Sequence, residues 1–593
     1  MKPDTLIIAV LTLSASIALL SGCHSDGDET LANKPAPHHS VKLSRTATIS
    51  AETVQGIVLS DDRQAIRQVS SKRQASDMAT ALLPPMPVST QERSMMTADL
   101  YGGENYAEMT RNATIQTVSQ PVSTFSIDVD TGSYANVRRF LQAGRLPPAN
   151  SVREEELLNY FSYDYNNASD TEQPFSLTTE LGRTPWNART RLLHIGLKGY
   201  VPPTSEIAAA NLVFLIDVSG SMNSPDKLGL LKSSISLMTQ QLDENDTVSL
   251  VVYAGSSGIV LEPTAGDQHR KIDQALSRLS AGGSTNGAQG IELAYQLASE
   301  HFKEDGVTRV ILATDGDFNV GISDVDQLKQ LIARKRESGI ALTTLGFGTG
   351  NYNDHLMEQL ADTGNGAYAY IDTLSEARKV LVDQLQATLL TIASDVKIQI
   401  EFNPAVVSEY RLIGYSNRQL ANEDFNNDRV DAGEIGAGHT VTALYEIALH
   451  GEGGERHSPS RYGRQDDKVS NEADDASLSS EVAELRLRYK LPGENDSRLS
   501  TRIVSLGDSG LQNLQANSDN FRFSASVAAF GQLLRGDDRL ADYDYQDARR
   551  LAANAMGDDP FGYRAEYLRL LDLAGSLDRL SRMDQYSPHR EEG

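Results

Sequence analysis

The stretch from Asn211 to Ile392 alternates short apolar runs with amphipathic segments, and this pattern constrains the fold more than any other feature. Leu212 to Ile216 is uninterrupted apolar sequence, which is typical of a strand covered on both faces. Further buried strands are expected at 247–253, 310–313 and 341–346, with helices at 227–242, 271–279, 288–301, 325–337, 355–360 and 375–392. Strands and helices in alternation predict a doubly wound α/β domain with a Rossmann-like sheet.

This α/β segment accounts for only part of a chain of 593 residues, which is too long for one hydrophobic core. Strand-like sequence lies on both sides of it, for example at 125–129 before it and at 396–402 and 440–447 after it. We therefore expect the α/β domain to be inserted in a β-sandwich. Amphipathic sequence between 521 and 580 predicts a helical C-terminal region.

The N-terminal sequence predicts secretion and lipid attachment. Lys2 is followed by an apolar segment, Leu6 to Leu20, which is short for a membrane span and typical of a signal peptide. Leu20-Ser21-Gly22-Cys23 resembles the bacterial lipobox, and Cys23 is the single cysteine of the chain. The resemblance implies that Cys23 is lipidated and that the membrane is reached only through this anchor. His24, in place of an aspartate, indicates the outer membrane of the bacterial envelope, facing the periplasm.

Composition and pattern together divide the chain into five parts. The sequence after Cys23 is polar and lacks sustained periodicity, so it predicts a disordered tether. The formal net charge is −26, which argues against nucleic acid as a partner. The predicted parts are the signal peptide at 1–22, the tether at 23–121, a β-rich N-terminal region at 122–205, the α/β domain at 206–392 and a C-terminal region at 393–593, β-rich and then helical.

Oxygen-bearing side chains follow two of the predicted buried strands and occupy a glycine-rich turn. Asp217, Ser219 and Ser221 come directly after the first strand, and Asp315 ends a later one. Thr285 lies in the turn Gly282 to Asn286. Open α/β sheets place ligands at the carboxyl ends of their strands, so these side chains are expected at one locus. Carboxylates and hydroxyls are hard ligands that suit Mg²⁺ or Mn²⁺.

Asp217-x-Ser219-x-Ser221, Thr285 and Asp315 resemble the metal-ion-dependent adhesion site of von Willebrand factor type A domains, with all five positions matched. Asn319 also fits the Thr-Asp-Gly-x-x-Asn form of the third motif. The resemblance implies that Asp217 and Asp315 hold the metal, directly or through water, and that the hydroxyls orient it. It also implies a protein partner that supplies an Asp or Glu carboxylate to the metal.

Sequence outside the α/β domain resembles the YfbK-like family of bacterial lipoproteins, in which a type A domain has family-specific regions on both sides. The matching residues are 126–134, Pro147-Pro148, Tyr415, 423–428 and 433–439. The resemblance runs from about Ser123 to the C-terminus.

A second oxygen-rich segment is spaced like the start of a calcium loop. Asp424, Asn426 and Asp428 occupy alternate positions, and Asp431 and Glu434 follow. The match fails at its sixth position, which is Arg429 in place of glycine. A Ca²⁺ site is one interpretation, and a surface turn rich in Asp and Asn is the favoured one.

Two Asp-containing motifs allow a comparison with aspartic proteases. Asp130-Thr131-Gly132 and Asp508-Ser509-Gly510 are similar to the carboxylate loops of those enzymes, but the chain lacks two matching lobes around them. No catalytic residue is assigned, and the expected function is metal-dependent protein binding without enzyme activity. Two alternatives stay open: a component of a transport or metal-loading assembly, and an extracytoplasmic hydrolase.

Overall fold

The computed structural model describes residues 103–168, 172–203, 208–284, 287–304, 306–316, 325–350, 352–458, 480–508 and 513–586. The predicted signal peptide, Cys23 and the first part of the predicted tether lie outside these residues. Among the described helices, none is long and apolar enough to cross a membrane.

The α/β domain is built on a six-stranded sheet with the order β10-β9-β8-β5-β6-β7. Its strands are β5 (Ala210–Asp217), β6 (Thr247–Tyr253), β7 (Ser257–Ala265), β8 (Val307–Thr314), β9 (Ala341–Phe347) and β10 (Tyr368–Ile371). All neighbouring strands are parallel except β7, which pairs antiparallel with β6. The chain first builds outward from β5 to β6 and then returns to its other side with β8. This reversal of strand order marks the place where doubly wound sheets bind ligands.

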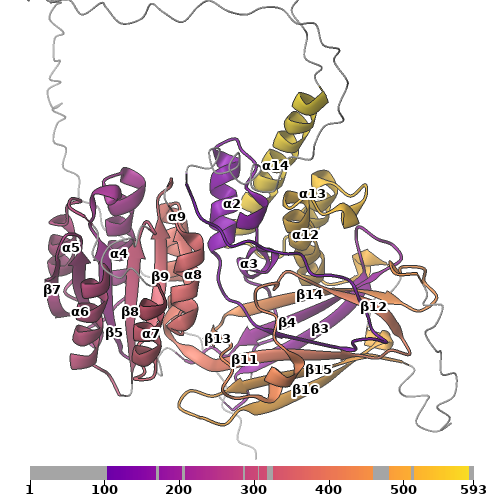
Figure 1. Cartoon of the computed structure of the whole chain (residues 1–593), viewed down its shortest axis with the longest axis horizontal. Coiled ribbons are helices and arrows are strands. Elements are labelled where there is room, and N and C mark those ends of the chain that lie inside the picture. The colour runs from indigo at the N-terminus through magenta and orange to yellow at the C-terminus, as the bar shows by residue number, and fades with distance from the viewer. Residues whose placement is uncertain are drawn as a thin grey trace, which may run out of the picture. The chain divides into compact units, whose positions relative to one another are not determined.

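Helices cover both faces of this sheet (Figure 1). They are α4 (Leu230–Thr239), α5 (His269–Ser277), α6 (Gly287–Glu300), α7 (Val325–Arg336), α8 (Asp354–Thr363) and α9 (Leu374–Arg378). Leu212, Phe214 and Ile216 of β5 pack with residues of α4, α5 and α9, whereas Val213 and Leu215 pack with α6, α7 and α8. The apolar run is therefore buried on both faces, which confirms the predicted doubly wound fold.

Two predicted helices of this domain have different boundaries. The first, predicted at 227–242, opens with a π-helical turn, η4 (Pro225–Gly229), before α4 begins. The second, predicted at 375–392, is divided into α9, a π-helical turn η5 (Lys379–Asp383) and α10 (Leu385–Leu389). It ends early because β11 begins at Thr391. Periodicity of 3.6 residues does not distinguish a π turn from a regular helix over so few residues.

Strands from both sides of the α/β domain form two sheets. They are β1 (Ile115–Gln116), β2 (Val122–Ser126), β3 (Phe175–Arg183), β4 (Arg191–Gly199), β11 (Thr391–Phe402), β12 (Val407–Ile413), β13 (Gly433–Gly436), β14 (Thr440–Leu449), β15 (Glu481–Lys490) and β16 (Arg498–Ser505). One sheet has the order β1-β12-β14-β4-β3, and the other has the order β13-β11-β15-β16 with β2 also paired to β11. Because β4 pairs with β14 and β2 with β11, each sheet combines strands from before and after the α/β domain, which is therefore inserted in the sandwich.

The predicted disordered tether extends to residue 121, and this prediction is wrong for residues 103–121, which contact the folded part of the chain. Ile115 of β1 pairs with Tyr410 of β12. The Asn112 amide donates to the carbonyl oxygens of Leu412 (3.1 Å) and Gly414 (2.7 Å). Residues 103–121 are held in place by the short strand β1 and by isolated side-chain hydrogen bonds. Neither feature produces a periodic hydrophobic pattern, so the sequence did not predict it.

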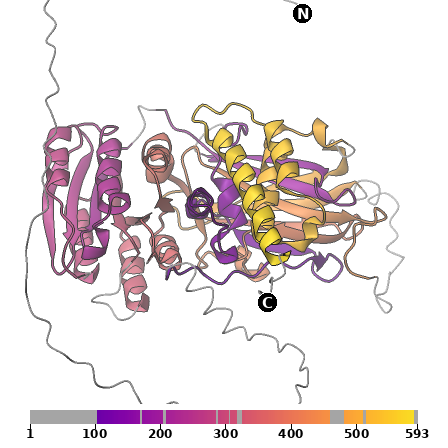
Figure 2. The same cartoon turned by 90° about the horizontal axis from the view of Figure 1, so that it is seen from above.

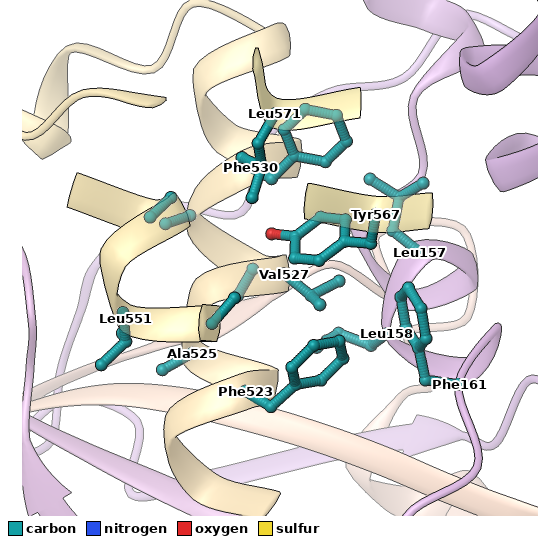
Figure 3. Close-up of a cluster of buried hydrophobic side chains, with 14 of the residues drawn as sticks. Leu157, Leu158, Phe161, Phe523, Ala525, Val527, Phe530, Leu551, Tyr567 and Leu571 are labelled. Atoms are coloured by element: carbon teal, nitrogen blue, oxygen red, sulfur yellow. The ribbon is translucent and has the colours of Figure 1, made fainter. Parts of the chain in front are cut away.

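A helical layer packs over the first of these sheets (Figures 1 and 2). It contains α2 (Gly132–Gln142), α3 (Glu154–Asn159), α12 (Asp519–Leu534), α13 (Tyr545–Ala553) and α14 (Tyr563–Tyr586). Phe161, Phe523, Tyr567 and Leu158 are buried together in its core (Figure 3). Burial of each large side chain stabilises the fold by about 1.5–3 kcal/mol. The predicted helical C-terminal region is thus confirmed.

Buried ion pairs join the α/β domain to this helical layer and to the sandwich. Arg153, at the start of α3, donates to Asp354 and Glu358 of α8, the latter over 2.8 Å. Arg138 of α2 donates to Asp372, which follows β10, and to Glu376 of α9 (2.8 Å). Arg418, which follows β12, contacts Asp128 and Asp130 as well as Glu358 and Asp362 of α8. We call these three sets of contacts the junction.

Candidate metal centre

The first element of the site is the turn after β5. Asp217 is the last residue of this buried strand, and its carboxylate is fully buried. Its Oδ1 accepts the backbone N–H of Ser219 (2.8 Å), and its Oδ2 accepts the hydroxyls of Thr314 (2.8 Å) and Tyr253 (3.2 Å). These contacts hold the carboxylate in one orientation at the end of the strand.

The two serines of the motif lie close together. The hydroxyl oxygens of Ser219 and Ser221 are 3.0 Å apart. Between them begins a short 3₁₀ turn, η3 (Gly220–Met222), whose Met222 side chain is fully buried in the core under α4. The buried methionine anchors the turn, so its hydroxyls stay at the edge of the sheet.

The third element follows β8, the strand next to β5. Asp315 is fully buried, and its Oδ2 accepts a hydrogen bond from Lys227 Nζ (2.9 Å). Thr314, the residue before it, contacts Asp217 directly through its hydroxyl. Gly316 adopts φ +85°, and a Cβ there would lie 2.5 Å from the backbone nitrogen of Asn353, so this turn admits only glycine. The two carboxylate-bearing turns therefore meet at one edge, as predicted.

The glycine-rich turn of the motif reaches the same edge. Gly220 N–H donates to the Gly283 carbonyl (3.1 Å), and Gly282 N–H donates to the Val218 carbonyl (2.8 Å). Thr285, two residues later, lies outside the described residues, as does Asn319. The structure thus brings together Asp217, Ser219, Ser221 and Asp315, whereas the position of Thr285 stays a prediction.

The donor set fits a hard divalent cation. Carboxylate and hydroxyl oxygens of this kind are the ligands that Mg²⁺ and Mn²⁺ prefer. Burial raises the pKa of Asp217 above its usual value, and hydrogen bonds from Ser219 and Thr314 partly offset this effect. A cation beside a buried carboxylate would compensate this loss of hydration. Within the described residues no group of three or more His, Cys, Asp and Glu side chains could hold a metal ion. The candidate centre has only two carboxylates, so it depends on hydroxyl donors.

Three residues at this edge were not assigned a role from the sequence. Tyr253 and Thr314 orient Asp217, and Lys227 pairs with Asp315. Tyr253 and Thr314 end the strands β6 and β8, which flank β5, so the strand ends themselves are the signal that would have pointed to them. Lys227 carries no such signal, because a lysine near the start of an amphipathic helix is common.

The segment 424–434, for which a surface turn was favoured over a Ca²⁺ site, is held by the chain's own cations. Lys397 Nζ donates to the carbonyl oxygens of Asp424 (3.2 Å) and Asn427 (2.7 Å), and Lys490 Nζ donates to that of Asp428 (2.8 Å). The remaining candidates are engaged as well or lie apart: Asn426 accepts from Arg488, Asp431 pairs with Arg336, and Glu434 is on β13. The loop is a surface turn stabilised by lysine and arginine, and the interpretation as a Ca²⁺ site is not retained.

The first protease-like aspartate belongs to the junction. Asp130 Oδ1 accepts the backbone N–H of Tyr368 (2.7 Å), and Asp130 Oδ2 accepts from Arg418 (3.2 Å). Asp508 lies in a short turn after β16, and Ser509 and Gly510 are outside the described residues. Asp130 thus contributes to domain contacts.

Comparison with known proteins agrees with this architecture. Three family profiles match: von Willebrand factor at residues 101–194, von Willebrand factor type A domain at 211–404, and YfbK, C-terminal, at 387–577. The Escherichia coli (strain K12) protein named "Uncharacterized protein YfbK" is 45% identical over 491 residues, which are 81% of this chain and 82% of that protein. The chain belongs to the YfbK family of bacterial proteins with a von Willebrand factor type A domain.

Other similarities cover less of the YfbK-family chain. The protein sll0103 of Synechocystis sp. is 32% identical over 167 residues, which are 28% of this chain and 39% of that protein. A solved von Willebrand factor type A structure from Catenulispora acidiphila is 16% identical, covers 65% of this chain and 87% of its own, and superposes with a TM-score of 0.37. Type A domains are protein-interaction modules that commonly bind a divalent metal, and membership of the family is consistent with a protein-interaction role for the α/β domain.

Proposed function

We propose that this YfbK-family protein binds a protein partner through a divalent cation, Mg²⁺ or Mn²⁺, held by Asp217, Ser219, Ser221, Thr285 and Asp315. The observation that carries the proposal is the direct contact between the two carboxylate-bearing turns, Thr314 Oγ1 to Asp217 Oδ2 at 2.8 Å. It brings both carboxylates to the edge where β5 and β8 end, at the reversal of strand order.

The chemistry of the edge favours binding over catalysis. When bound, the cation supplies an electrophilic position that takes an anionic oxygen from a partner. The chain contributes orientation: Tyr253 and Thr314 fix the Asp217 carboxylate, and the buried Met222 fixes the turn that carries the two serines. A partner side chain of Asp or Glu provides the oxygen of the required charge. We assign no nucleophile or general base.

Metal removal tests the first half of the proposal. At a Mg²⁺ concentration of about 100 times the dissociation constant, the folded protein should gain about 2.7 kcal/mol in unfolding free energy over the EDTA-treated protein. Asp217→Ala should abolish this gain. The matched control is Asp273→Ala, an exposed carboxylate of α5 that accepts a hydrogen bond from Ser236 (2.7 Å), and this variant should keep the full gain. A wild-type protein that shows no change in melting temperature with Mg²⁺ or Mn²⁺ would contradict the metal site.

Partner capture tests the second half. Full-length wild type and the same two variants serve as baits in envelope extracts with Mg²⁺ or with EDTA, and the captured proteins are quantified by mass spectrometry. Partners that depend on the metal should fall at least tenfold with EDTA and with Asp217→Ala, and stay with Asp273→Ala. Recovery of the same partners by wild type and Asp217→Ala would rule out metal-dependent binding as the function.

We also propose that the protein is anchored by lipid on Cys23 in the bacterial envelope, at the outer membrane. The support is the lipobox-like sequence around the single cysteine. Labelling of growing cells with an alkyne fatty acid should mark wild type and leave Cys23→Ser unmarked. Labelling of Cys23→Ser at the wild-type level would contradict the anchor.

A further inference from the structure

A buried lysine contacts the candidate metal centre. Lys227 lies in the π turn η4, and its ammonium group donates to Asp315 Oδ2 over 2.9 Å. Its side chain is 9% exposed and that of Asp315 is not exposed at all, so the pair lies inside the protein. π turns are rare and occur frequently at functional sites. The turn brings Lys227 to the edge where β8 ends.

The surroundings of Lys227 are shaped to receive it. Gly348, which directly follows β9, has φ +76°, and a Cβ at this position would lie 2.3 Å from Cγ and Cε of Lys227. The Gly348 carbonyl in turn accepts the hydroxyl of Tyr370 (2.6 Å), which fixes the backbone against which the lysine stem packs. The ammonium group is therefore held beside Asp315 by packing as well as by charge.

Among the described residues of this edge, the formal charges of Asp217, Asp315 and Lys227 add up to one negative charge. Asp217 and Asp315 contribute one negative charge each and Lys227 contributes one positive charge, whereas the serine hydroxyls are neutral. A divalent cation bound there would leave one net positive charge among these groups, and without Lys227 the sum would be zero. In a buried place such a difference changes the affinity for any incoming charge.

We propose that Lys227 is a positioning residue that sets the charge of the metal centre, weakening metal binding while strengthening the binding of an anionic carboxylate ligand to the metal-loaded site. This inference rests on the proposed metal-dependent function. It predicts effects of opposite sign on the two binding steps when the lysine charge is removed. A lysine that only supported the fold of the turn would weaken both steps when replaced.

The test uses Mn²⁺ as the metal probe and acetate as the carboxylate probe. Mn²⁺ affinity of the full chain is measured from the water-proton relaxation of the bound ion, and acetate is then titrated into the Mn²⁺-loaded protein. Lys227→Met retains most of the side-chain volume and removes the charge, and Lys227→Gln provides a second neutral variant. The matched control is Lys232→Met, because Lys232 on α4 also carries a positive charge but donates to the Leu279 carbonyl.

We expect Lys227→Met and Lys227→Gln to bind Mn²⁺ about tenfold more tightly and acetate at least about fivefold more weakly than wild type, by loss of one nearby charge. Lys232→Met should match wild type in both. Weaker binding of both probes, or no change in either, would overturn the role of Lys227. Melting curves in EDTA verify that each variant is folded. If wild type itself binds no Mn²⁺, the proposed function fails, an outcome distinct from an unchanged Lys227 variant.

Discussion

Buried carboxylates gather both at the metal edge, which is formed by Asp217, Ser219, Ser221 and Asp315, and at the junction, and the cations beside them differ. At the junction, Arg418 contacts Asp128 (3.4 Å), Asp130 (3.2 Å), Glu358 (3.5 Å) and Asp362 (2.8 Å). At the metal edge, two carboxylates accept hydrogen bonds from hydroxyl groups and from one lysine, and the two serine hydroxyls lie beside them. Guanidinium groups present several donors in a fixed plane and suit permanent contacts, whereas hydroxyls leave room for an exchangeable cation.

The difference indicates what each place does. The junction carboxylates form ion pairs that hold α8 against α3 and against the segment that carries Arg418. At the metal edge, Asp217 accepts from the hydroxyls of Thr314 and Tyr253 and from the backbone N–H of Ser219, and Asp315 accepts from Lys227. A buried acid is therefore a candidate ligand here only where the neighbouring groups do not already form a guanidinium network. Three predictions test this reading.

The largest effect is expected from breaking the junction. Arg153 is fully buried and pairs with Glu156 (3.0 Å), Glu358 (2.8 Å) and Asp354. Arg153→Ala removes a buried cation from these carboxylates, of which Glu358 alone also contacts Arg418, so the free energy of unfolding should fall by about 3–5 kcal/mol. Urea denaturation measures the change.

The control for this variant is an exposed ion pair. Arg550 pairs with Asp547 within α13, and the Arg550 side chain is 72% exposed. Arg550→Ala should change the free energy of unfolding by at most about 1 kcal/mol. A loss below about 1 kcal/mol for Arg153→Ala would show that the junction contributes little, and the contrast with the metal edge would then lose its basis.

A smaller effect comes from the pH dependence of a buried carboxyl group that is next to the junction in sequence. Glu155 of α3 is fully buried, and burial raises its pKa to about 7, with the carboxylates of Glu154 and Asp128 adding to the shift. The unfolded chain releases this proton near the ordinary value of 4.5, so the folded state binds more protons between pH 4.5 and 7. Stability therefore decreases as pH rises through this window.

Glu155→Gln removes this dependence. The variant should match wild type near pH 4.5 and be more stable by on the order of 3 kcal/mol at pH 8. Denaturation of both proteins across this range gives the comparison, and Glu300→Gln, a surface change on α6, is the control. A difference between wild type and Glu155→Gln that stays constant from pH 4.5 to pH 8 would contradict the assignment.

These comparisons also show how much of the fold and of the candidate site can be predicted from the sequence. The apolar run of β5 and the motif Asp217-x-Ser219-x-Ser221 predicted the fold and the edge, because strand burial and strand ends are local properties. The junction was not predicted, since Arg153 and Glu358 are 205 positions apart and their pairing depends on domain contacts. The same holds for Lys227 and Asp315, which are 88 positions apart. Side-chain spacing in the sequence predicts which oxygen atoms could bind a metal. Which lysines and arginines lie beside those oxygen atoms depends on contacts between distant parts of the chain.

The smallest effect is expected at the loop around Asp424, which resembles the metal edge in spacing and the junction in surroundings. Lys397 and Lys490 already hold its carbonyl oxygens, and Asp428 accepts the hydroxyl of Ser497 (2.6 Å). The hydrogen bond from Ser497 lowers the pKa of Asp428, so its carboxylate stays ionised without a metal.

Millimolar Ca²⁺ should therefore leave the melting temperature of Asp217→Ala unchanged, a background in which the metal edge is disabled. Asp424→Asn should change the free energy of unfolding by at most about 0.5 kcal/mol, as for other surface substitutions. A Ca²⁺-dependent rise in melting temperature that Asp424→Asn removes would mean that an inorganic cation displaces the lysines. The contrast between this loop, whose carbonyl oxygens accept from lysines, and the metal edge would then fail. If the melting temperature does not move, equal spacing of donors at 217–221 and 424–428 leads to different chemistry, because lysines hold the carbonyl oxygens of the loop, whereas Asp217 accepts from hydroxyl groups and a backbone N–H.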